Sequence, residues 1–160
     1  MKELLAHPQT NVNQAQTTTG VTPLLIASQI GHVEVVKELL DHPQTDVTHV
    51  NQGLTADGAT PLFLASQNGH VEVVKALLAD PRVDPNKLRT KWKDNAISIA
   101  LHYNGNLEVV KLLLRCPDVI LGVKDKDGKT ELDYAKEKGF PENVKAIESR
   151  QTLLQQDHTC

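Results

Sequence analysis

A stretch of nineteen residues occurs twice in this chain with few changes. "TPLLIASQIGHVEVVKELL" begins at Thr22 and "TPLFLASQNGHVEVVKALL" begins at Thr60, an offset of 38 residues. A more divergent third copy contains "EVVK" at Glu108, 36 residues after Glu72. Self-similarity with a period of about 20 to 50 residues is the signature of stacked repeat proteins. We therefore expect a row of similar layers instead of a single round core.

The copies divide the chain into five successive units. The first is incomplete, because "KELLAHPQTNVN" from Lys2 aligns with the second half of a unit, "KELLDHPQTDVT" from Lys37. The last is rich in charged residues, as expected for a polar cap that ends a stack. We predict a single domain over 1–150 with a partly disordered tail at 151–160. The predicted units are 1–17 (partial), 18–55, 56–90, 91–124 and 125–150 (cap).

Each full unit predicts two short helices joined by a turn. Thr22 precedes Pro23, a pair typical of a helix start, because the hydroxyl accepts a backbone N–H and proline fits the first turn. Gly31 marks the end of that helix, and "HVEVVKELL" predicts the second with one apolar stripe. Helices of this length do not persist alone in water. Stacking joins their stripes into a continuous core.

The segments between units predict hairpins. "ADGAT" and "KDGKT" contain the Asp-Gly pair that is typical of tight turns. Five surplus residues between Leu40 and Thr60 predict an enlarged hairpin around 47–56.

These residues resemble the ankyrin repeat, whose pattern is close to D-x-x-G-x-T-P-L-H-x-A-A-x-x-G-H-x-E-V-V-x-x-L-L. The segments 22–40 and 60–78 match it at most fixed positions, and the resemblance extends to about Arg150. It implies an all-α ankyrin solenoid of helix-turn-helix units with short hairpin fingers. One departure concerns the His of "TPLH", whose hydrogen bonds we expect to be absent. The residues in its place are Leu25, Phe63, Ser98 and Asp133.

The resemblance also implies a function, namely non-catalytic binding of another protein in a concave groove lined by the fingers and the first helices. Positions that the repeat pattern leaves free are the candidates for contact with that partner. They are Thr19, Val21, Gln29, Ile30, Ala56, Asp57, Ala59, Gln67, Asn68, Lys91, Trp92, Asp94, His102, Tyr103, Lys126, Asp127 and Lys129.

Trp92, the only tryptophan, falls at a finger position between Lys91 and Lys93. One hypothesis makes it an aromatic anchor for a partner, with Arg89 and the two lysines favouring an acidic partner surface, since Trp and Arg are enriched at interface hot spots. The alternative is that Trp92 covers a neighbouring finger or repairs the irregular third unit. The sequence leaves both open.

Other kinds of chemistry find little support. The net charge of −3 gives no field that attracts nucleic acid or an anionic membrane. "GKT" at Gly128 lacks the glycine spacing of a phosphate-binding loop, and "KDKDG" lacks the spacing of a calcium loop. His7 and His42 occupy the same place in neighbouring loops, about 10 Å apart by helix packing, too far for one zinc ion. We predict no catalytic residue, metal or cofactor.

Three functional readings stay open at this point. The chain is a stand-alone adaptor or inhibitor, a substrate-recruiting or regulatory domain of a larger protein or enzyme, or a structural array. Whether it is a small natural domain or part of a longer array is also open. Cys116 and Cys160 form no motif, which favours a reducing compartment without a disulfide. We expect a monomer, with no membrane association, in the cytoplasm or alternatively the nucleus.

Overall fold

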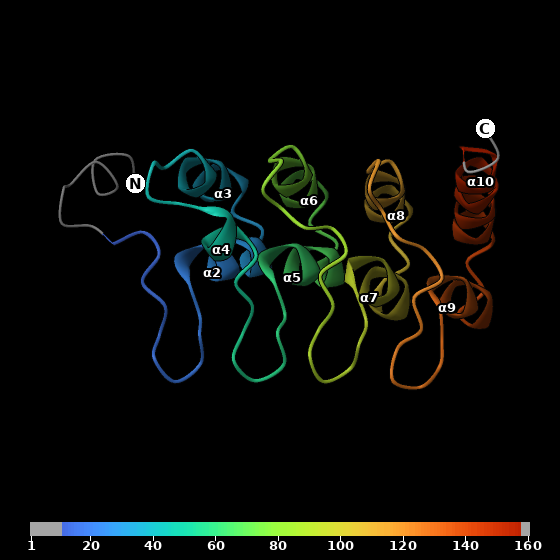
Figure 1. Cartoon of the computed structure of the whole chain (residues 1–160), viewed down its shortest axis with the longest axis horizontal. Coiled ribbons are helices and arrows are strands. Elements are labelled where there is room, and N and C mark those ends of the chain that lie inside the picture. The colour runs from blue at the N-terminus through green and yellow to red at the C-terminus, as the bar shows by residue number, and fades with distance from the viewer. Residues whose placement is uncertain (1–10, 158–160) are drawn as a thin grey trace.

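The computed structural model describes residues 11–157, which contain nine helices and no strand. Eight helices form four successive pairs, arranged in a row (Figure 1). The pairs are α2 (Pro23–Ile30) with α3 (Val33–Leu40), α5 (Pro61–Asn68) with α6 (Val71–Leu78), α7 (Ala96–Tyr103) with α8 (Leu107–Leu114), and α9 (Glu131–Glu137) with α10 (Pro141–Asp157). The predicted all-α solenoid is confirmed.

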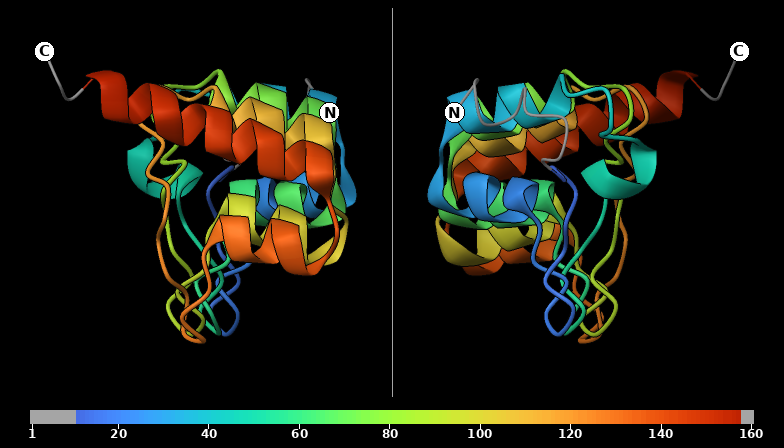
Figure 2. Two further views of the ribbon diagram at one scale, coloured as in Figure 1. Left: turned by 90° about the vertical axis from the view of Figure 1, so that its right-hand side faces the viewer. Right: turned by 90° about the vertical axis from the view of Figure 1, so that its left-hand side faces the viewer.

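The helices lie in two layers. We call α2, α5, α7 and α9 the inner helices and α3, α6, α8 and α10 the outer helices, because each set contacts its own neighbours along the row (Figure 1). Four hairpins, the fingers, project from this double layer (Figure 2). Backbone hydrogen bonds close their tips, which are Gln16–Val21, Leu54–Ala59, Arg89–Asp94 and Asp125–Lys129, here called fingers 1 to 4.

The regular units start and stop where their caps predict. The Thr22 hydroxyl accepts a hydrogen bond from the Leu25 N–H at 3.2 Å, and Thr60 does the same in the next unit. Gly31 ends α2 with φ of 83°, a left-handed conformation that glycine adopts without strain. The helix boundaries are therefore fixed by local chemistry.

The divergent units begin with a different cap. Asn95 precedes α7, and its side chain accepts hydrogen bonds from Ile97 and Ser98 N–H groups. Ser98 accepts in return from the Asn95 N–H at 2.9 Å, which completes a capping box. Thr130 and Asp133 make the equivalent reciprocal pair at α9. The position of the family histidine thus serves helix capping in these two units.

In the first two full units the same position is apolar and buried. Leu25 and Phe63 are 0% and 2% exposed, in a small cluster on the inner helices. The main core runs along the row between the two helix layers. Val36, Val74 and Val110 hold equivalent positions in successive outer helices, and each is 0% exposed. One packing solution is therefore repeated from layer to layer.

The surplus residues after the first full unit do not enlarge a finger, and that expectation is wrong. They form a short helix, α4 (Val47–Val50), between α3 and finger 2. The Asp46 carboxylate caps it by accepting from the Thr48 and His49 N–H groups, and Val50 is 1% exposed in the main core. The insertion therefore folds as a helical turn with an aspartate cap at its start and a buried valine at its end.

The C-terminal helix is longer than the predicted domain. α10 continues to Asp157, so residues 151–157 of the predicted tail are helical. Figure 2 shows this helix extending beyond the other outer helices. The predictions for residues 158–160 and for most of the partial first unit lie outside the described residues.

The N-terminal end of the described row shows what stacking contributes. Ile26, Leu64 and Ile99 occupy equivalent positions on three inner helices, but they are 47%, 6% and 3% exposed. Leu64 and Ile99 each lie at an interface with the preceding inner helix, α2 and α5 respectively. The same position is therefore core where a described inner helix precedes it, and half exposed on α2, where the described row of inner helices begins.

This difference leads to a paired mutational test. Leu64→Ala should lower the free energy of unfolding by about 2–4 kcal/mol, because it leaves a cavity between two units. Ile26→Ala should cost less than about 1 kcal/mol, because its side chain is half exposed. Urea denaturation of both variants measures the two costs, and equal losses would contradict stacking as the source of stability.

The cap unit buries a carboxyl group. Glu131 stands where the earlier units have Pro23 and Pro61, and it is 1% exposed. One of its oxygens, Oε1, accepts a hydrogen bond from the Gly122 N–H at 2.6 Å. Burial disfavours the charged form and raises the pKa of Glu131 despite that bond. Ionisation of Glu131 therefore works against folding.

A pH dependence follows from this burial. Because the folded-state pKa lies above the ordinary value of 4.5, the stability from protonated Glu131 is complete below pH 4.5 and is lost as pH rises through the folded pKa. Glu131→Gln should remove that loss and raise stability at pH 7. Urea denaturation between pH 4.5 and 8 tests it, with the exposed Glu108→Gln as the control. Parallel pH profiles for Glu131→Gln and the parent chain would refute the assignment.

Candidate functional site

Neighbouring finger tips are joined by backbone hydrogen bonds of 2.8–3.0 Å. In each case an N–H of one tip donates to a carbonyl of the tip before it. The pairs are Thr55 to Thr19, Thr90 to Asp57, and Lys126 to Trp92. The tips therefore form a continuous ledge, which lies at an angle to the inner helices (Figure 2). We call the exposed surface of the ledge and of the inner helices the inner face.

Most of the predicted contact residues are on the surface. Ten of the seventeen are exposed: Thr19, Gln29, Ile30, Ala56, Asn68, Lys91, His102, Tyr103, Lys126 and Asp127. Six are partly buried: Val21, Asp57, Gln67, Trp92, Asp94 and Lys129. Ala59 is 1% exposed and packs in the cluster with Phe63, so its side chain does not reach the inner face. The turn that follows Asp57 directs it inward.

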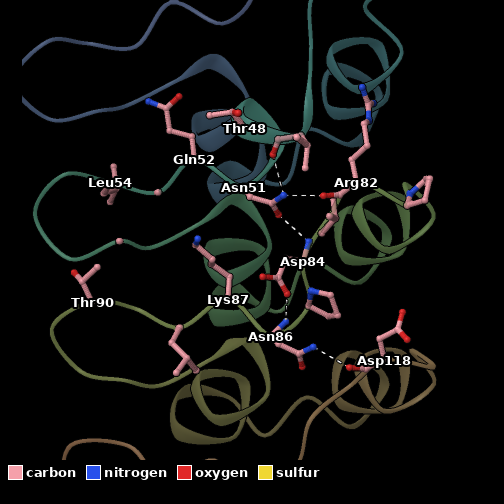
Figure 3. Close-up of a pocket in the computed structure, with 17 residues that line it drawn as sticks. Thr48, Asn51, Gln52, Leu54, Arg82, Asp84, Asn86, Lys87, Thr90 and Asp118 are labelled. Atoms are coloured by element: carbon pink, nitrogen blue, oxygen red, sulfur yellow. Dashed lines mark hydrogen bonds between the residues drawn. The ribbon is translucent and has the colours of Figure 1, made fainter.

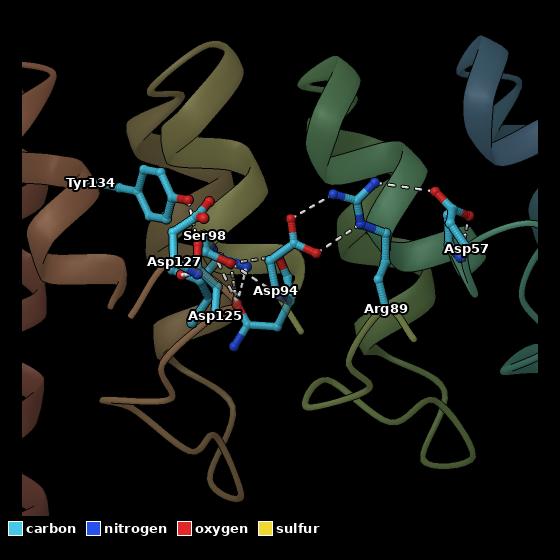
Figure 4. A network of polar contacts seen from close by, with 10 residues as sticks. Asp57, Arg89, Asp94, Ser98, Asp125, Asp127 and Tyr134 are labelled. Carbon is cyan, nitrogen blue, oxygen red and sulfur yellow. Dashed lines mark hydrogen bonds and ion pairs between the residues drawn. The ribbon is translucent and has the colours of Figure 1, made fainter. Parts of the chain in front are cut away.

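Arg89 connects fingers 2 and 3 (Figure 4). Its guanidinium makes two parallel hydrogen bonds to Asp94, at 2.7 and 2.6 Å, and a third to Asp57 at 3.1 Å. Its Cζ lies 4.4 Å from the centroid of the Phe63 ring. Burial opposes the charge, but the bonds to Asp94 and Asp57 outweigh it and raise the pKa of Arg89.

This arrangement changes the predicted roles of three residues. Arg89 was expected to face an acidic partner, but it forms ion pairs with Asp94 and Asp57 within the molecule. The two aspartates were predicted contacts, and their carboxylates turn toward Arg89. A bidentate pair of this geometry fixes orientation as well as charge. All three position the ledge, and only their exposed edges remain for a partner.

Finger 4 is held in a similar way. Asp125 accepts a hydrogen bond from the Tyr134 hydroxyl and two from the N–H groups of Asp127 and Lys129 (Figure 4). Burial alone would raise the pKa of Asp125, but these bonds lower it. The pKa of Tyr134 is raised by burial and by its bond to Asp125. This tip is therefore anchored to α9 through a buried tyrosine.

Trp92 is half-buried in finger 3. Lys126 of finger 4 places its Nζ 4.6 Å from the ring centroid, and Lys91 places its own at 5.1 Å. The ring thus contacts the next finger, as the structural hypothesis expects, and part of it stays on the surface. Its role as an anchor for a partner remains a prediction.

The inner helices contribute an exposed aromatic pair above this ledge. Tyr103 on α7 is 62% exposed, and its ring centroid lies 5.2 Å from that of His102. His102 also lies 5.4 Å from the ring of Tyr134 on α9. An exposed tyrosine beside a second ring is a common element of protein interfaces, because it offers apolar area and a polar tip together.

Lys93 has a backbone conformation that sequence reasoning did not anticipate. Its φ is 60°, the one positive value outside glycine among residues 11–157. Equivalent places in the other tips hold Gly20, Gly58 and Gly128, with φ of 70°, 79° and 77°. Alignment of the four tips could have revealed it, because a lysine stands where the other fingers have glycine.

A substitution measures the strain at this position. Lys93→Gly should raise the free energy of unfolding by about 0.5–1 kcal/mol, because the left-handed conformation costs a lysine about 1–2 kcal/mol and the added freedom of the unfolded chain offsets part of the gain. Lys91→Gly, at a residue with negative φ, is the matched control and should destabilise. Thermal unfolding of both variants distinguishes them. A loss of stability in both would show that the position is unstrained.

A hollow lies behind the fingers, on the side away from the inner helices. It has a volume of about 800 Å³ and is walled by α4 and the loop 81–88 (Figure 3). Asn51 donates to the Arg82 carbonyl at 2.7 Å and accepts from the Asp84 N–H, while Asn86 donates to the Asp118 carbonyl. These side chains tie successive loops together, so the hollow is explained by stacking.

The described residues contain no group of three or more His, Cys, Asp or Glu that could hold a metal ion. No helix among them has both the length and the apolar character to span a membrane. His70 contacts the Gln29 carbonyl of the preceding unit at 2.9 Å. Cys116 is a free thiol whose pKa is raised by burial. The predictions for His7 and Cys160 lie outside the part of the chain that the structure describes.

Comparison with known proteins agrees with the repeat pattern. A family model described as ankyrin repeats (3 copies) matches residues 1–89, which is more than half of the 160 residues. No curated protein matches the chain.

Proposed function

The chain belongs to the ankyrin repeat family, whose members are generally protein interaction modules, and from this premise we propose that it is a non-catalytic module that binds another protein through its inner face. The observation that carries the proposal is the exposed pair His102 and Tyr103 on a face whose ledge is fixed by hydrogen bonds. A rigid surface loses little freedom on binding, which favours affinity.

The contact set follows from exposure and internal bonding. Its C-terminal half lies on fingers 3 and 4 and on α7, and consists of Lys91, Trp92, His102, Tyr103 and Lys126. The N-terminal half has no charged or aromatic side chain and consists of Thr19, Gln29, Ile30, Ala56, Gln67 and Asn68. Trp and Tyr are enriched at interface hot spots, so the C-terminal half, which carries Trp92 and Tyr103, should contribute most of the binding free energy.

The role of a substrate-recruiting or regulatory domain in a larger protein remains the alternative proposal. It uses the same inner face and differs only in what the rest of the polypeptide does. The proposal also includes a monomeric state and an intracellular, cytoplasmic place of action, with the nucleus as the alternative. The free thiol of Cys116 is in keeping with a reducing compartment.

Affinity capture with matched variants tests the proposed face. His102→Ala with Tyr103→Ala should reduce recovery of bound proteins by about tenfold or more, because truncation of a hot-spot aromatic typically costs 2 kcal/mol or more. The control carries Glu108→Ala and Lys111→Ala on α8, which are exposed on the outer helix of the same unit.

Thermal unfolding of both variants must match the parent chain for the comparison to count. Loss of the same captured proteins in the inner-face variant alone supports the proposal. Equal recovery by both variants, or equal loss in both, would refute the inner face as the binding surface.

A further inference from the structure

The four finger tips differ in charge. Fingers 1 and 2 carry no lysine or arginine at their tips, where residues 17–19 are all threonine and 55–57 read Thr-Ala-Asp. Fingers 3 and 4 carry Lys91, Lys93, Lys126 and Lys129, with Lys124 just before the tip. This end of the ledge is lysine-rich although the whole chain has a net charge of −3.

Two of the carboxylates near these lysines bind other groups of the molecule instead of the lysines. Asp94 is paired with Arg89, and Asp125 accepts hydrogen bonds from Tyr134 and from the backbone. Asp127 pairs with Lys126, but this ion pair lies on the surface, where both side chains are more than a third exposed. Surface pairs of that kind are weak and exchange readily for other partners.

Several lysines have no such partner. Among residues 11–157, Lys91, Lys93 and Lys124 form no ion pair, and all three are exposed. Lys91 and Lys126 hold their ammonium groups near the Trp92 ring. Two lysines from neighbouring fingers therefore lie against one half-buried aromatic side chain, and Lys93 directly follows it in the sequence.

The backbone of Lys93 supplies a separate observation. The other three tips place glycine at this left-handed position, and the chain accepts strain to place a lysine there. Strained backbone that persists is a reason to look for a function of the side chain it displays. Here the strained residue adds an exposed cation to the tip of finger 3.

We propose that the tips of fingers 3 and 4 recognise an acidic segment of the partner protein, with carboxylates on Lys91, Lys93, Lys124 and Lys126 and an apolar side chain against Trp92. This inference rests on the proposed function and names the chemistry of the partner. A carboxylate-rich chain complements the unpaired ammonium groups of Lys91, Lys93 and Lys124 and can replace the exposed Asp127 at Lys126. Charge complementarity raises association rate and selectivity. An apolar residue beside the carboxylates covers the open part of the tryptophan ring.

A defined peptide tests this directly. The probe is a fluorescein-labelled twelve-residue peptide of Asp and Glu with one central Leu, and its partner control has Lys at every acidic position. Anisotropy titration at low salt should show binding of the acidic peptide alone. Raising salt from about 20 to 200 mM should weaken it several-fold, because the Debye length shortens. Emission of Trp92, the only tryptophan, should change on binding.

Charge-matched variants locate the contact. Lys91→Glu with Lys93→Glu should reduce affinity about tenfold or more, while Lys75→Glu with Lys111→Glu on the outer helices should change it less than about threefold. Both pairs shift the net charge from −3 to −7, because each change subtracts two charges. Lys93→Gly should lose affinity while gaining stability, a combination that a purely structural lysine would not produce.

Three results would overturn the inference. They are equal losses in the two charge-matched pairs, equal binding of the acidic and basic peptides, and tighter binding of a single-stranded oligonucleotide than of the acidic peptide. These results leave the proposed function separately testable. Captured proteins that depend on His102 and Tyr103 but not on Lys91 and Lys93 would preserve the inner face as a binding surface and refute its acidic selectivity.

Discussion

The contact between one unit and the next is the interaction on which this structure depends. Inner and outer helices of seven or eight residues are too short to be stable alone, and only α10 is long. Val36, Val74 and Val110 are fully buried because each lies where its layer meets its neighbours. Ile26 shows the converse, since the same type of position is half exposed on α2, the first inner helix among the described residues 11–157. Sequence repetition is therefore a consequence of one packing problem solved several times.

Polar side chains fix the register of the contact between one unit and the next. Asn51 and Asn86 each bridge to the following loop, and Arg82 reaches back to the Leu40 carbonyl at the end of α3. Apolar surfaces alone permit sliding between layers, whereas hydrogen bonds to backbone groups fix one register. Backbone hydrogen bonds between neighbouring finger tips hold the tips in the same register. The inner face is thus positioned by contacts that lie far from it.

Helix boundaries could be read from the sequence because their causes are local. Thr22 and Gly31 cap α2 with atoms a few residues away. Features that join distant segments could not be read in this way. Arg89 pairs with Asp57, 32 residues earlier, and the register of two fingers decides whether they meet. Ala59 fell in the contact set because the pattern showed a finger position but not which way the turn points. The insertion at α4 was misjudged since length alone does not show where extra residues fold.

A solenoid separates what the layers must share from what they are free to vary, and the charge of the tips illustrates this. Fingers 2 to 4 each donate a backbone hydrogen bond to the preceding tip, whatever their side chains are. Fingers 3 and 4 can therefore carry lysines, and finger 3 even a lysine in place of glycine, without breaking the row. Because neighbouring layers are fixed side by side, the cations of both fingers would face the proposed acidic partner together. Selectivity in such a molecule arises from the sum of adjacent tips, and no single layer contains it.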